Sequence, residues 1–464
     1  MAELDGYPGY ASETLDKLRA TEYAHLDRDG EVYLDYTGAG VYADAQLRAH
    51  HERLAGRAYG NPHSENPASA ASTELVESAR RAVLRFLDAD PDEYAVIFTP
   101  NASGACRLVG EAYPFGDLVM TFDNHNSVNG IREYARRAGG ARRYVALEGP
   151  ELRIPTSAVA EALREGPGGL FAFPAQSNFT GVQHPLDWVD LAHDAGYDVL
   201  LDVAAYLPTN PLDLSRVRPD FVPISWYKVF GYPTGIGCLV ARRSSLQRLR
   251  RPWFAGGTIA AVSVGTEWHQ QAPDESAFED GTLNFLNIPD VEFGLDWLEA
   301  AGRDAVRLRV GALTGWLLDR LVALRHANGR PMARIYGPAG AEGRGATVAF
   351  NLLDPDGRVV DERLVAAEAT RAGLSLRTGC FCNPGAGEGA FGIGLDRLHA
   401  SADWGVRTID DYLALIGLPH GGAVRVSFGI ASNHADVRRL VGFLESAYRD
   451  RHTDTSGLAP RLRC

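Results

Sequence analysis

The sequence predicts an α/β fold with a large domain built on a mixed, mostly parallel sheet, followed by a smaller α+β domain. The first observation is a series of short apolar runs at residues 94–98, 118–121, 169–173, 199–201 and 236–240. These runs do not alternate between apolar and polar residues, which is typical of strands buried on both faces. The second observation is that helical stretches, for example 74–87 and 186–195, separate most of the runs. This alternation indicates a parallel sheet covered by helices.

The pattern changes from about residue 290, and the change predicts the smaller domain. Two strands are expected over 346–351 and 423–428, and two helices over 361–372 and 435–448. The Gly- and His-rich segment 385–422 is expected to be an inserted loop that covers a site. One long amphipathic helix is indicated by apolar residues that recur every three or four positions, namely Val306, Val310, Leu313, Leu317, Leu321 and Leu324.

These patterns divide the chain into three parts. The large α/β domain is expected over residues 30–290, and the small domain over 1–29 together with 291–448. The polar segment 449–464 is expected to be a loosely held tail.

The composition narrows the class of protein. A chain of 464 residues with 45% hydrophobic and 23% charged residues is expected to form two globular domains. The formal net charge of −13 argues against binding to nucleic acid or to an anionic membrane surface. No run approaches the roughly 18 apolar residues that span a bilayer. The acidic start is not a secretory signal, and five cysteines form no disulfide framework, so a reducing cytoplasm is expected.

The most informative stretch is residues 225–235, Ser-Trp-Tyr-Lys-Val-Phe-Gly-Tyr-Pro-Thr-Gly. It places Lys228 after a hydroxyl residue and an aromatic residue, and before a glycine-containing turn. Asp202 closes the apolar run 198–201, with room for one more strand before the lysine. An acid at a strand end, one further strand and a lysine in a loop is the layout that holds pyridoxal phosphate. The lysine forms a Schiff base, and the acid pairs with the pyridinium nitrogen.

Other residues that could bind the phosphate or the ring of the cofactor also follow predicted strands. Residues 98–105 combine a strand, a turn of small residues that includes Ala102 and Ser103, and the start of a helix, whose amides can hold a phosphate. His125 lies between a strand and a helix, where its ring could stack on a flat cofactor. Asn178 also follows a strand end, and open α/β sheets bind ligands along that edge. Ser225, Tyr227 and the Gly-Gly-Thr turn ending at Thr258 add further hydroxyls.

Taken in order, these motifs resemble those of the class V aminotransferase family of pyridoxal-phosphate enzymes, which have fold type I. The resemblance extends from about residue 33 to 443. Within that family the chain is most similar to the desulfurase domain of molybdenum cofactor sulfurases. The strings that carry this similarity are Asp-Asn-His-Asn-Ser-Val at 123–128, Gly-Ile-Arg-Glu-Tyr at 130–134, the lysine stretch, and Arg-Thr-Gly-Cys-Phe-Cys-Asn-Pro-Gly-Ala at 377–386.

The resemblance implies roles for the cofactor-binding residues. Lys228 would hold the cofactor covalently, and Asp202 would pair with its ring nitrogen. His125 would stack on the ring, and Asn178 would lie near the ring oxygen or the substrate. The phosphate would be held by a set consisting of Ala102, Ser103, Ser225, Tyr227 and, from the second subunit of a homodimer, Thr258.

Two positions depart from the broader desulfurase pattern. Three residues past Asp202, where many relatives have Gln or His, this chain has Ala205, and the residue before the lysine is Tyr227 in place of His. The molybdenum-cofactor branch is similar at both positions. The group that bonds the phenolic oxygen of the cofactor therefore stays open.

The resemblance also implies sulfur chemistry at Cys382. This residue lies in a Gly- and Pro-rich loop beside Arg377, and nearby positive charge favours a nucleophilic thiolate. In the family, this cysteine takes sulfur from bound cysteine as a persulfide. Arg425, inside an apolar strand, matches the arginine that binds the substrate carboxylate, which a guanidinium can hold through two hydrogen bonds. Arg377 is assigned to substrate binding together with it.

The remaining cysteines are interpreted as structural or incidental. A zinc site at Cys380 and Cys382 is disfavoured because His399 belongs to no ligand pattern, so no metal is expected. Cys106 and Cys238 are expected to be structural, and Cys464 could be a second exposed thiol.

The expected activity is conversion of L-cysteine to L-alanine, with sulfur passed to a small-molecule or protein acceptor. One alternative is another class V enzyme, such as a lyase, epimerase or aminotransferase acting on a different amino acid. Another is a non-catalytic scaffold or sulfur carrier. Whether the sulfur serves molybdenum cofactor or a specialised metabolite is left open.

Overall fold

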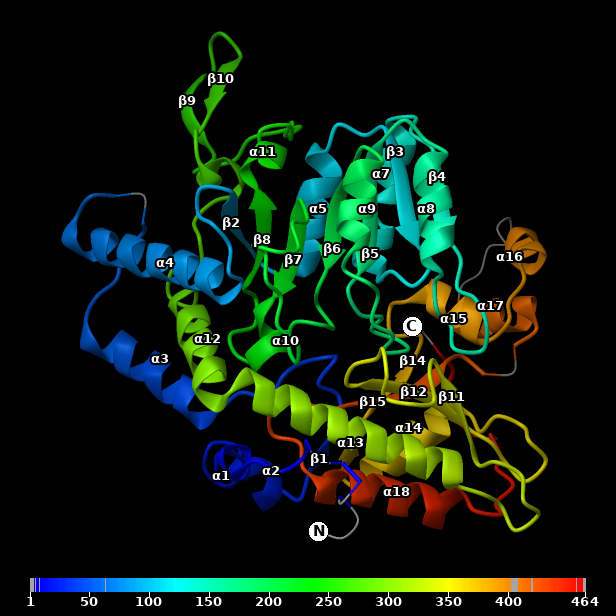
Figure 1. Ribbon diagram of the computed structural model, residues 1–464. Helices are drawn as coiled ribbons and strands as arrows, with labels where there is room; N and C mark the ends of the chain where they lie inside the picture. The colour runs from blue at the N-terminus through cyan, green and yellow to red at the C-terminus, as the bar shows by residue number, and fades with distance from the viewer. Residues whose placement is uncertain are drawn as a thin grey trace.

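The computed structural model describes residues 4, 6, 7, 9–62, 64–401, 408–418, 420–455 and 457–461. A seven-stranded sheet forms the centre of the large domain, in the order β2-β8-β7-β6-β5-β3-β4 (Figure 1). β8 is antiparallel to its two neighbours, and all other pairs are parallel. The predicted mixed, mostly parallel sheet is confirmed. Its strands are β2 (Tyr94–Thr99), β3 (Asp117–Thr121), β4 (Arg142–Val145), β5 (Gly169–Pro174), β6 (Tyr197–Asp202), β7 (Phe221–Ser225) and β8 (Gly237–Arg242).

The strands lack alternation because both faces of the sheet are buried. In β5, Leu170 and Ala172 belong to one apolar cluster, and Phe171 and Phe173 belong to another on the opposite face. The first cluster includes residues of α5 (Ala102–Ala112), α6 (Asn126–Asn129) and α7 (Arg132–Arg137). The second includes residues of α4 (Pro67–Phe86), α8 (Thr156–Arg164), α9 (Trp188–Asp194) and α12 (Pro289–Ala301). The predicted helices 74–87 and 186–195 correspond to α4 and α9.

The C-terminal part contains a four-stranded antiparallel sheet in the order β11-β12-β15-β14. The predicted long helix is α13 (Arg303–Ala323), which lies beside α18 (His434–Tyr448) below the large sheet in Figure 1. The predicted strands and the two other predicted helices differ from the observed ones by at most one residue at each end. The elements are β11 (Ala333–Tyr336), β12 (Thr347–Leu352), α14 (Glu362–Arg371), β14 (Arg377–Gly379) and β15 (Ala423–Ser427).

The N-terminal segment packs against this small sheet. It forms α1 (Glu13–Thr21), α2 (Ala24–Arg28) and β1 (Val32–Tyr33), and β1 pairs with β13 (Leu374–Ser375). Arg19 of α1 donates to the carbonyl of Ala431 at 2.8 Å and lies 3.2 Å from a carboxylate oxygen of Asp436.

Segment 385–422 is not the loop that the sequence predicts, because its described residues form helices. These are α15 (Pro384–Ala390), α16 (Leu395–Ser401) and α17 (Ile409–Ile416). Two of these helices begin at side-chain caps, which compensate for weak apolar periodicity. Asn383 caps α15, and Thr408 forms a capping box at α17.

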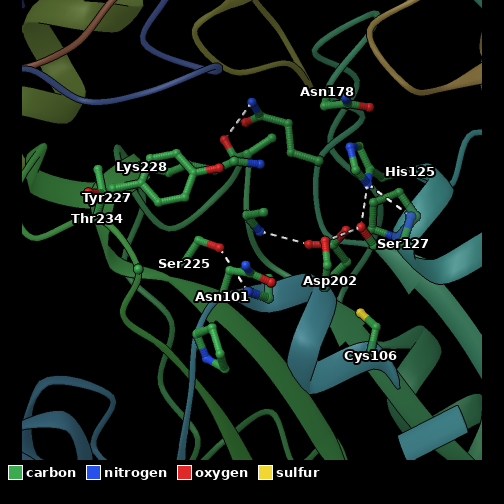
Figure 2. A pocket seen from close by; sticks show the side chains of 18 residues that line it. Asn101, Cys106, His125, Ser127, Asn178, Asp202, Ser225, Tyr227, Lys228 and Thr234 are labelled. Atoms are coloured by element: carbon green, nitrogen blue, oxygen red, sulfur yellow. Dashed lines mark hydrogen bonds between the residues drawn. The ribbon is translucent and has the colours of Figure 1, made fainter. Parts of the chain in front are cut away.

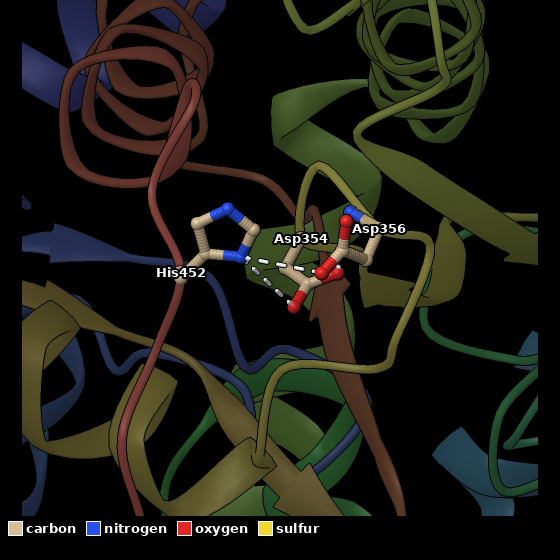
Figure 3. Close-up of side chains that lie close together, drawn as sticks. All are labelled: Asp354, Asp356 and His452. Carbon is tan, nitrogen blue, oxygen red and sulfur yellow. Dashed lines mark hydrogen bonds and ion pairs between the residues drawn. The ribbon is translucent and has the colours of Figure 1, made fainter.

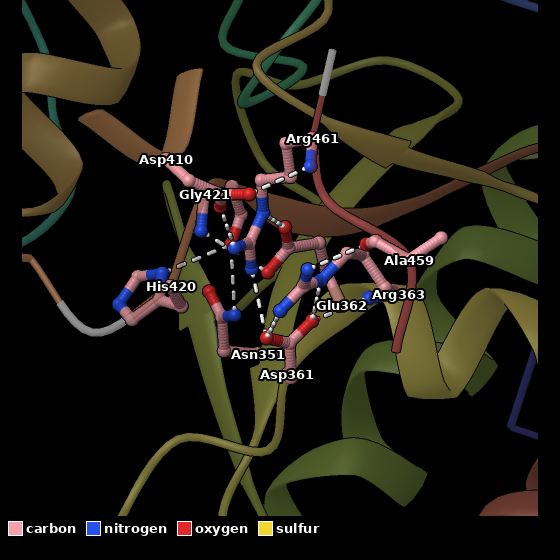
Figure 4. Close-up of polar contacts among 10 residues, drawn as sticks. Asn351, Asp361, Glu362, Arg363, Asp410, His420, Gly421, Ala459 and Arg461 are labelled. Carbon is pink, nitrogen blue, oxygen red and sulfur yellow. Dashed lines mark hydrogen bonds and ion pairs between the residues drawn. The ribbon is translucent and has the colours of Figure 1, made fainter. Parts of the chain in front are cut away.

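The C-terminal segment is also more firmly held than expected at Arg461. This side chain lies 2.6 Å from Glu362, 2.8 Å from Asp361 and 2.7 Å from Asp410 (Figure 4). Such a network joins the end of the chain to α14 and α17. Cys464 lies outside the described residues.

A hairpin that the sequence did not predict projects from the large domain (Figure 1). It consists of β9 (Ile259–Ser263) and β10 (Trp268–Gln271), and most of its residues are exposed. Across the described ranges, none of the helices has both the length and the apolar character needed to cross a bilayer.

Candidate functional site

A cavity of about 340 Å³ lies at the carboxyl edge of the large sheet (Figure 2). The turns that follow β2, β3, β5, β6 and β7 all contribute to its wall. The carboxyl ends of parallel strands meet at one edge, which is where open α/β sheets bind ligands. Of the nine residues predicted to hold a cofactor, all except Thr258 line it: Ala102, Ser103, His125, Asn178, Asp202, Ser225, Tyr227 and Lys228.

The start of α5 forms one wall of the cavity and is suited to an anion. Asn101 caps the helix by accepting a hydrogen bond from Gly104 N at 2.9 Å. The backbone N–H of Ala102 donates to Ser225 Oγ at 2.9 Å, and the hydroxyls of Ser103 and Ser127 are 2.6 Å apart. The helix dipole and these hydroxyls together favour a phosphate group.

Lys228 lies within the short helix α10 (Trp226–Phe230), which directly follows β7. The prediction of a lysine in a loop is therefore wrong in this detail. Burial lowers the pKa of the Lys228 amine, whereas the nearby carboxylate of Asp202 opposes that shift. Asp202 is the last residue of β6 and accepts a hydrogen bond from Ala204 N at 2.9 Å. The cavity thus holds an amine biased toward its neutral form, together with a carboxylate.

His125 is the N-cap of α6, and its ring lines the cavity. Its Nδ1 accepts a hydrogen bond from Ser127 N at 3.1 Å. Burial, aided by the nearby positive charge of Lys228, lowers the pKa of the imidazole to about 4. At neutral pH the ring is uncharged, and its proton is on Nε2 because Nδ1 acts as an acceptor.

Cys382 is a free and exposed thiol on a loop with unusual backbone geometry. The φ angles of Phe381 and Cys382 are 56° and 53°, a left-handed conformation that ordinary residues rarely adopt. Hydrogen bonds hold this backbone, since Asn126 N donates to Cys382 O at 2.7 Å and Asn178 Nδ2 donates to Phe381 O at 2.8 Å. The ring of Phe381 also packs 5.1 Å from that of Phe179.

The other described cysteines differ from Cys382. Cys380 is disulfide-bonded. Cys106 and Cys238 are buried, and burial raises the pKa of both thiols. Cys106 nevertheless lines the cavity beneath Asp202, a position that the sequence did not indicate.

The two arginines predicted to bind substrate share one carboxylate, that of Asp35. Arg425 is buried on β15, and its Nη2 lies 2.9 Å from Asp35 Oδ1. Arg377, opposite it on β14, donates from Nε and Nη2 to Asp35 Oδ2 at 2.8 and 2.6 Å. Arg425 also donates to Asn178 O at 3.0 Å and lies 4.7 Å from the Phe381 ring centre. Sequence reasoning missed Asp35 because its partners are more than 340 residues away.

Three further residues, Thr258, Ala205 and Gln176, remain to be placed relative to the cavity. The hydroxyl of Thr258 bonds to the backbone of Ala255 in its own turn, and it does not line the cavity of its own chain. Near Ala205, where many relatives have a longer polar residue, Gln176 Nε2 donates to Ala205 O at 2.9 Å. Gln176 lines the cavity, and no pattern in the sequence indicated it.

A small group of possible metal ligands lies apart from this cavity. His452 Nδ1 is 3.7 Å from carboxylate oxygens of Asp354 and Asp356 (Figure 3). Asp354 also accepts hydrogen bonds from the backbone N–H groups of Asp356 and Arg358. The backbone hydrogen bonds of this tight turn account for the position of Asp354.

Comparisons with known proteins agree with the motifs. The model of the family described as Aminotransferase class-V matches residues 32–440. The molybdenum cofactor sulfurase of Solanum lycopersicum is 36% identical, over 99% of this chain and 61% of that protein. The Homo sapiens protein of the same name is 34% identical, over 94% of this chain and 52% of that protein. The chain therefore spans about half to three-fifths of the length of these relatives.

Solved structures share the fold at lower identity. The apo cysteine desulfurase from Thermococcus onnurineus NA1 has a TM-score of 0.76 and 22% identity, over 94% of this chain and 99% of that chain. The cysteine desulfurase CsdA from Escherichia coli, in an S-sulfonic acid form, has a TM-score of 0.74 and 21% identity, over 93% of this chain and 98% of that chain. This likeness confirms the predicted fold class.

Proposed function

Because the chain belongs to the class-V aminotransferase family, we propose that it is a pyridoxal-phosphate-dependent cysteine desulfurase. It would convert L-cysteine to L-alanine and keep the released sulfur as a persulfide on Cys382. The names of its relatives at 34% and 36% identity agree with sulfur transfer. The observation that carries the proposal is the presence of Lys228 and Asp202 in the cavity together with the free thiol of Cys382. The loop of that thiol is joined to the cavity wall by the hydrogen bond from Asn178 to Phe381 O.

The residues of the cavity fit pyridoxal phosphate. When bound, this cofactor withdraws electrons from the α-carbon of an amino acid. The first turn of α5, with Ser103 and Ser225, would hold the phosphate. Asp202 would keep the ring nitrogen protonated, and the uncharged His125 ring would stack on the cofactor. Lys228 would be the covalent attachment point.

Lys228 would also move the α-proton of the substrate. A general base must be unprotonated, and the burial that lowers the lysine pKa favours this form. Arg425 would bind the substrate carboxylate. Among the described residues, its Nε has no hydrogen-bond partner, so the guanidinium retains a donor beyond those used by Asp35 and Asn178.

Cys382 would then act as the nucleophile. Its thiolate forms a bond to the substrate sulfur while the substrate carbon–sulfur bond breaks, and the carbon takes up a proton to give alanine. The persulfide sulfur would pass to a small molecule or protein. A scaffold without chemistry does not account for the coexistence of a buried amine and a free thiol.

We also propose that the protein works as a homodimer, because the β9–β10 hairpin is poorly supported by its own chain. Its exposed apolar side chains are Val262, Val264 and Trp268. Thr258 lies directly before this hairpin and would approach the cavity of the second subunit. Burial of the hairpin against that subunit would remove its apolar surface from water.

The test is incubation of the purified, cofactor-loaded protein with L-cysteine, followed by peptide mass spectrometry and alanine analysis. We expect one added sulfur on Cys382 and release of alanine. The Cys382→Ala variant should lose both, whereas Cys238→Ala, which changes a buried thiol away from the cavity wall, should retain both. Loaded protein that turns over without Cys382 would instead support a lyase, epimerase or aminotransferase.

A further inference from the structure

The loop that carries Cys382 is joined to the substrate side of the cavity by a buried asparagine, Asn383. This side chain has no exposed surface. Its Nδ2 donates to Asp123 O at 2.7 Å and to Asn178 Oδ1 at 2.8 Å, and its Oδ1 accepts from Ala386 N at 3.1 Å. Both amide protons and the oxygen are therefore in use.

Asn178 connects this amide to the groups that would meet the substrate. Its own Nδ2 donates to Phe381 O at 2.8 Å, and its carbonyl accepts from Arg425 Nη1 at 3.0 Å. Asn178 also lines the cavity. One hydrogen-bonded network therefore joins Arg425, the backbone on both sides of Cys382 and the turn that follows β3.

The loop needs such restraint because its backbone conformation is costly. Phe381 and Cys382 both have positive φ angles, and non-glycine residues in that region cost on the order of 1–3 kcal/mol each. Surrounding contacts must stabilise the conformation, and the fully buried side chain of Asn383, the residue next to Cys382, supplies two of them through its Nδ2. A nucleophile displaced by about 1 Å can lose on the order of 100-fold in rate.

We infer that Asn383 is a positioning residue for Cys382, which aims the thiol at the sulfur of a substrate held by Arg425. The effect that we expect on the rate of persulfide formation rests on the proposed function. The structural consequence, an immobilised loop 380–386, does not depend on that function.

The test uses Asn383→Ser in the cofactor-loaded protein. Serine is a good N-cap and keeps α15 capped, but it is too short to bridge Asp123 and Asn178. Asn433→Ser is the matched control, because Asn433 also caps a helix by accepting from Asp436 N, at 3.0 Å, and does not line the cavity. Asn383→Asp is a second variant that retains the cap but replaces both donors by an acceptor.

We expect amide hydrogen exchange in residues 380–386 to become at least about 10-fold faster in both Asn383 variants and to remain unchanged in the control. We expect persulfide formation on Cys382 to fall about 10- to 100-fold, with the KM for cysteine and the cofactor content retained. Unchanged exchange, or a wild-type rate of persulfide formation in Asn383→Ser, would overturn the inference. If the wild type itself forms no persulfide while the variants still loosen the loop, the proposed function is rejected and the positioning of the loop stands.

Discussion

Asp35 shows how a single carboxylate can hold two arginine side chains in place at the proposed substrate site. Arg425 is buried, and a buried cation without a partner is strongly destabilising. The carboxylate of Asp35 provides that partner and also binds Arg377, whose side chain is half-exposed. Both guanidinium groups are thus fixed before any substrate binds, which reduces the ordering cost of binding a carboxylate.

The acid sensitivity of the unloaded protein should depend on His125. Its pKa is about 4 in the folded protein, against an ordinary value of 6.5. Between these values the unfolded chain binds a proton that the folded chain does not, so stability falls as the pH decreases. From about pH 7 to about pH 5, the wild type should lose about 2 kcal/mol more unfolding free energy than His125→Gln. Urea unfolding at the two pH values measures this difference, and equal losses in the two proteins would contradict it.

At the level of elements, the site depends on how closely β8 approaches the β2–α5 turn. A Cβ at Gly237 would lie 2.5 Å from Ile224 O and 2.7 Å from Asn101 Cα. Only glycine fits there without moving the turn. The turn begins the helix that would hold the phosphate, so the packing of an antiparallel strand determines the shape of the anion site.

This close approach predicts that Gly237→Ala weakens cofactor binding. The added methyl should displace the start of α5 and lower the unfolding free energy by about 1–3 kcal/mol. Titration with pyridoxal phosphate, followed by absorbance, should show a weaker apparent affinity than in the wild type. Gly442→Ala in α18 is the control, since its Cβ would meet no atom within 4 Å, alanine favours a helix, and the residue does not line the cavity. Equal affinities for the two variants would refute the argument.

The sequence was sufficient to predict site residues that lie at the ends of buried strands. His125, Asn178 and Asp202 come after apolar runs, and the ends of parallel strands share one edge, so their meeting could be predicted. Asp35 and Asn383 could not be predicted, because their partners are brought close only by the folded chain. For Asp35 and Arg377, these partners are 342 residues apart.

Some elements were missed for a different physical reason. The glycine-rich helix α15 has low intrinsic helix propensity, and its cap and its buried residues stabilise it. The β9–β10 hairpin has no buried apolar run, so the pattern that identified the other strands was absent. Both elements depend on contacts that local sequence patterns do not contain.

For the whole molecule, the projecting hairpin should determine the oligomeric state. An isolated two-stranded ribbon is only marginally stable in water, yet this one displays Val264 at 92% and Trp268 at 53% exposure. Apolar residues on such a ribbon indicate that another surface covers it, and in a homodimer that surface belongs to a second copy. Trp253 and Phe254, which precede the hairpin and are also exposed, extend the same apolar region.

Light scattering coupled to size-exclusion chromatography should therefore give the mass of a dimer for the wild type. The double variant Val264→Asp/Trp268→Asp should be a monomer, because each carboxylate would be buried without a partner in the interface. Val322→Asp, which changes a residue of 45% exposure on α13, should remain a dimer. The monomer should also bind pyridoxal phosphate more weakly, since Thr258 would no longer approach the neighbouring cavity. A double variant that stays dimeric would show that subunits associate through another face and would remove the reason to assign Thr258 to the partner's site.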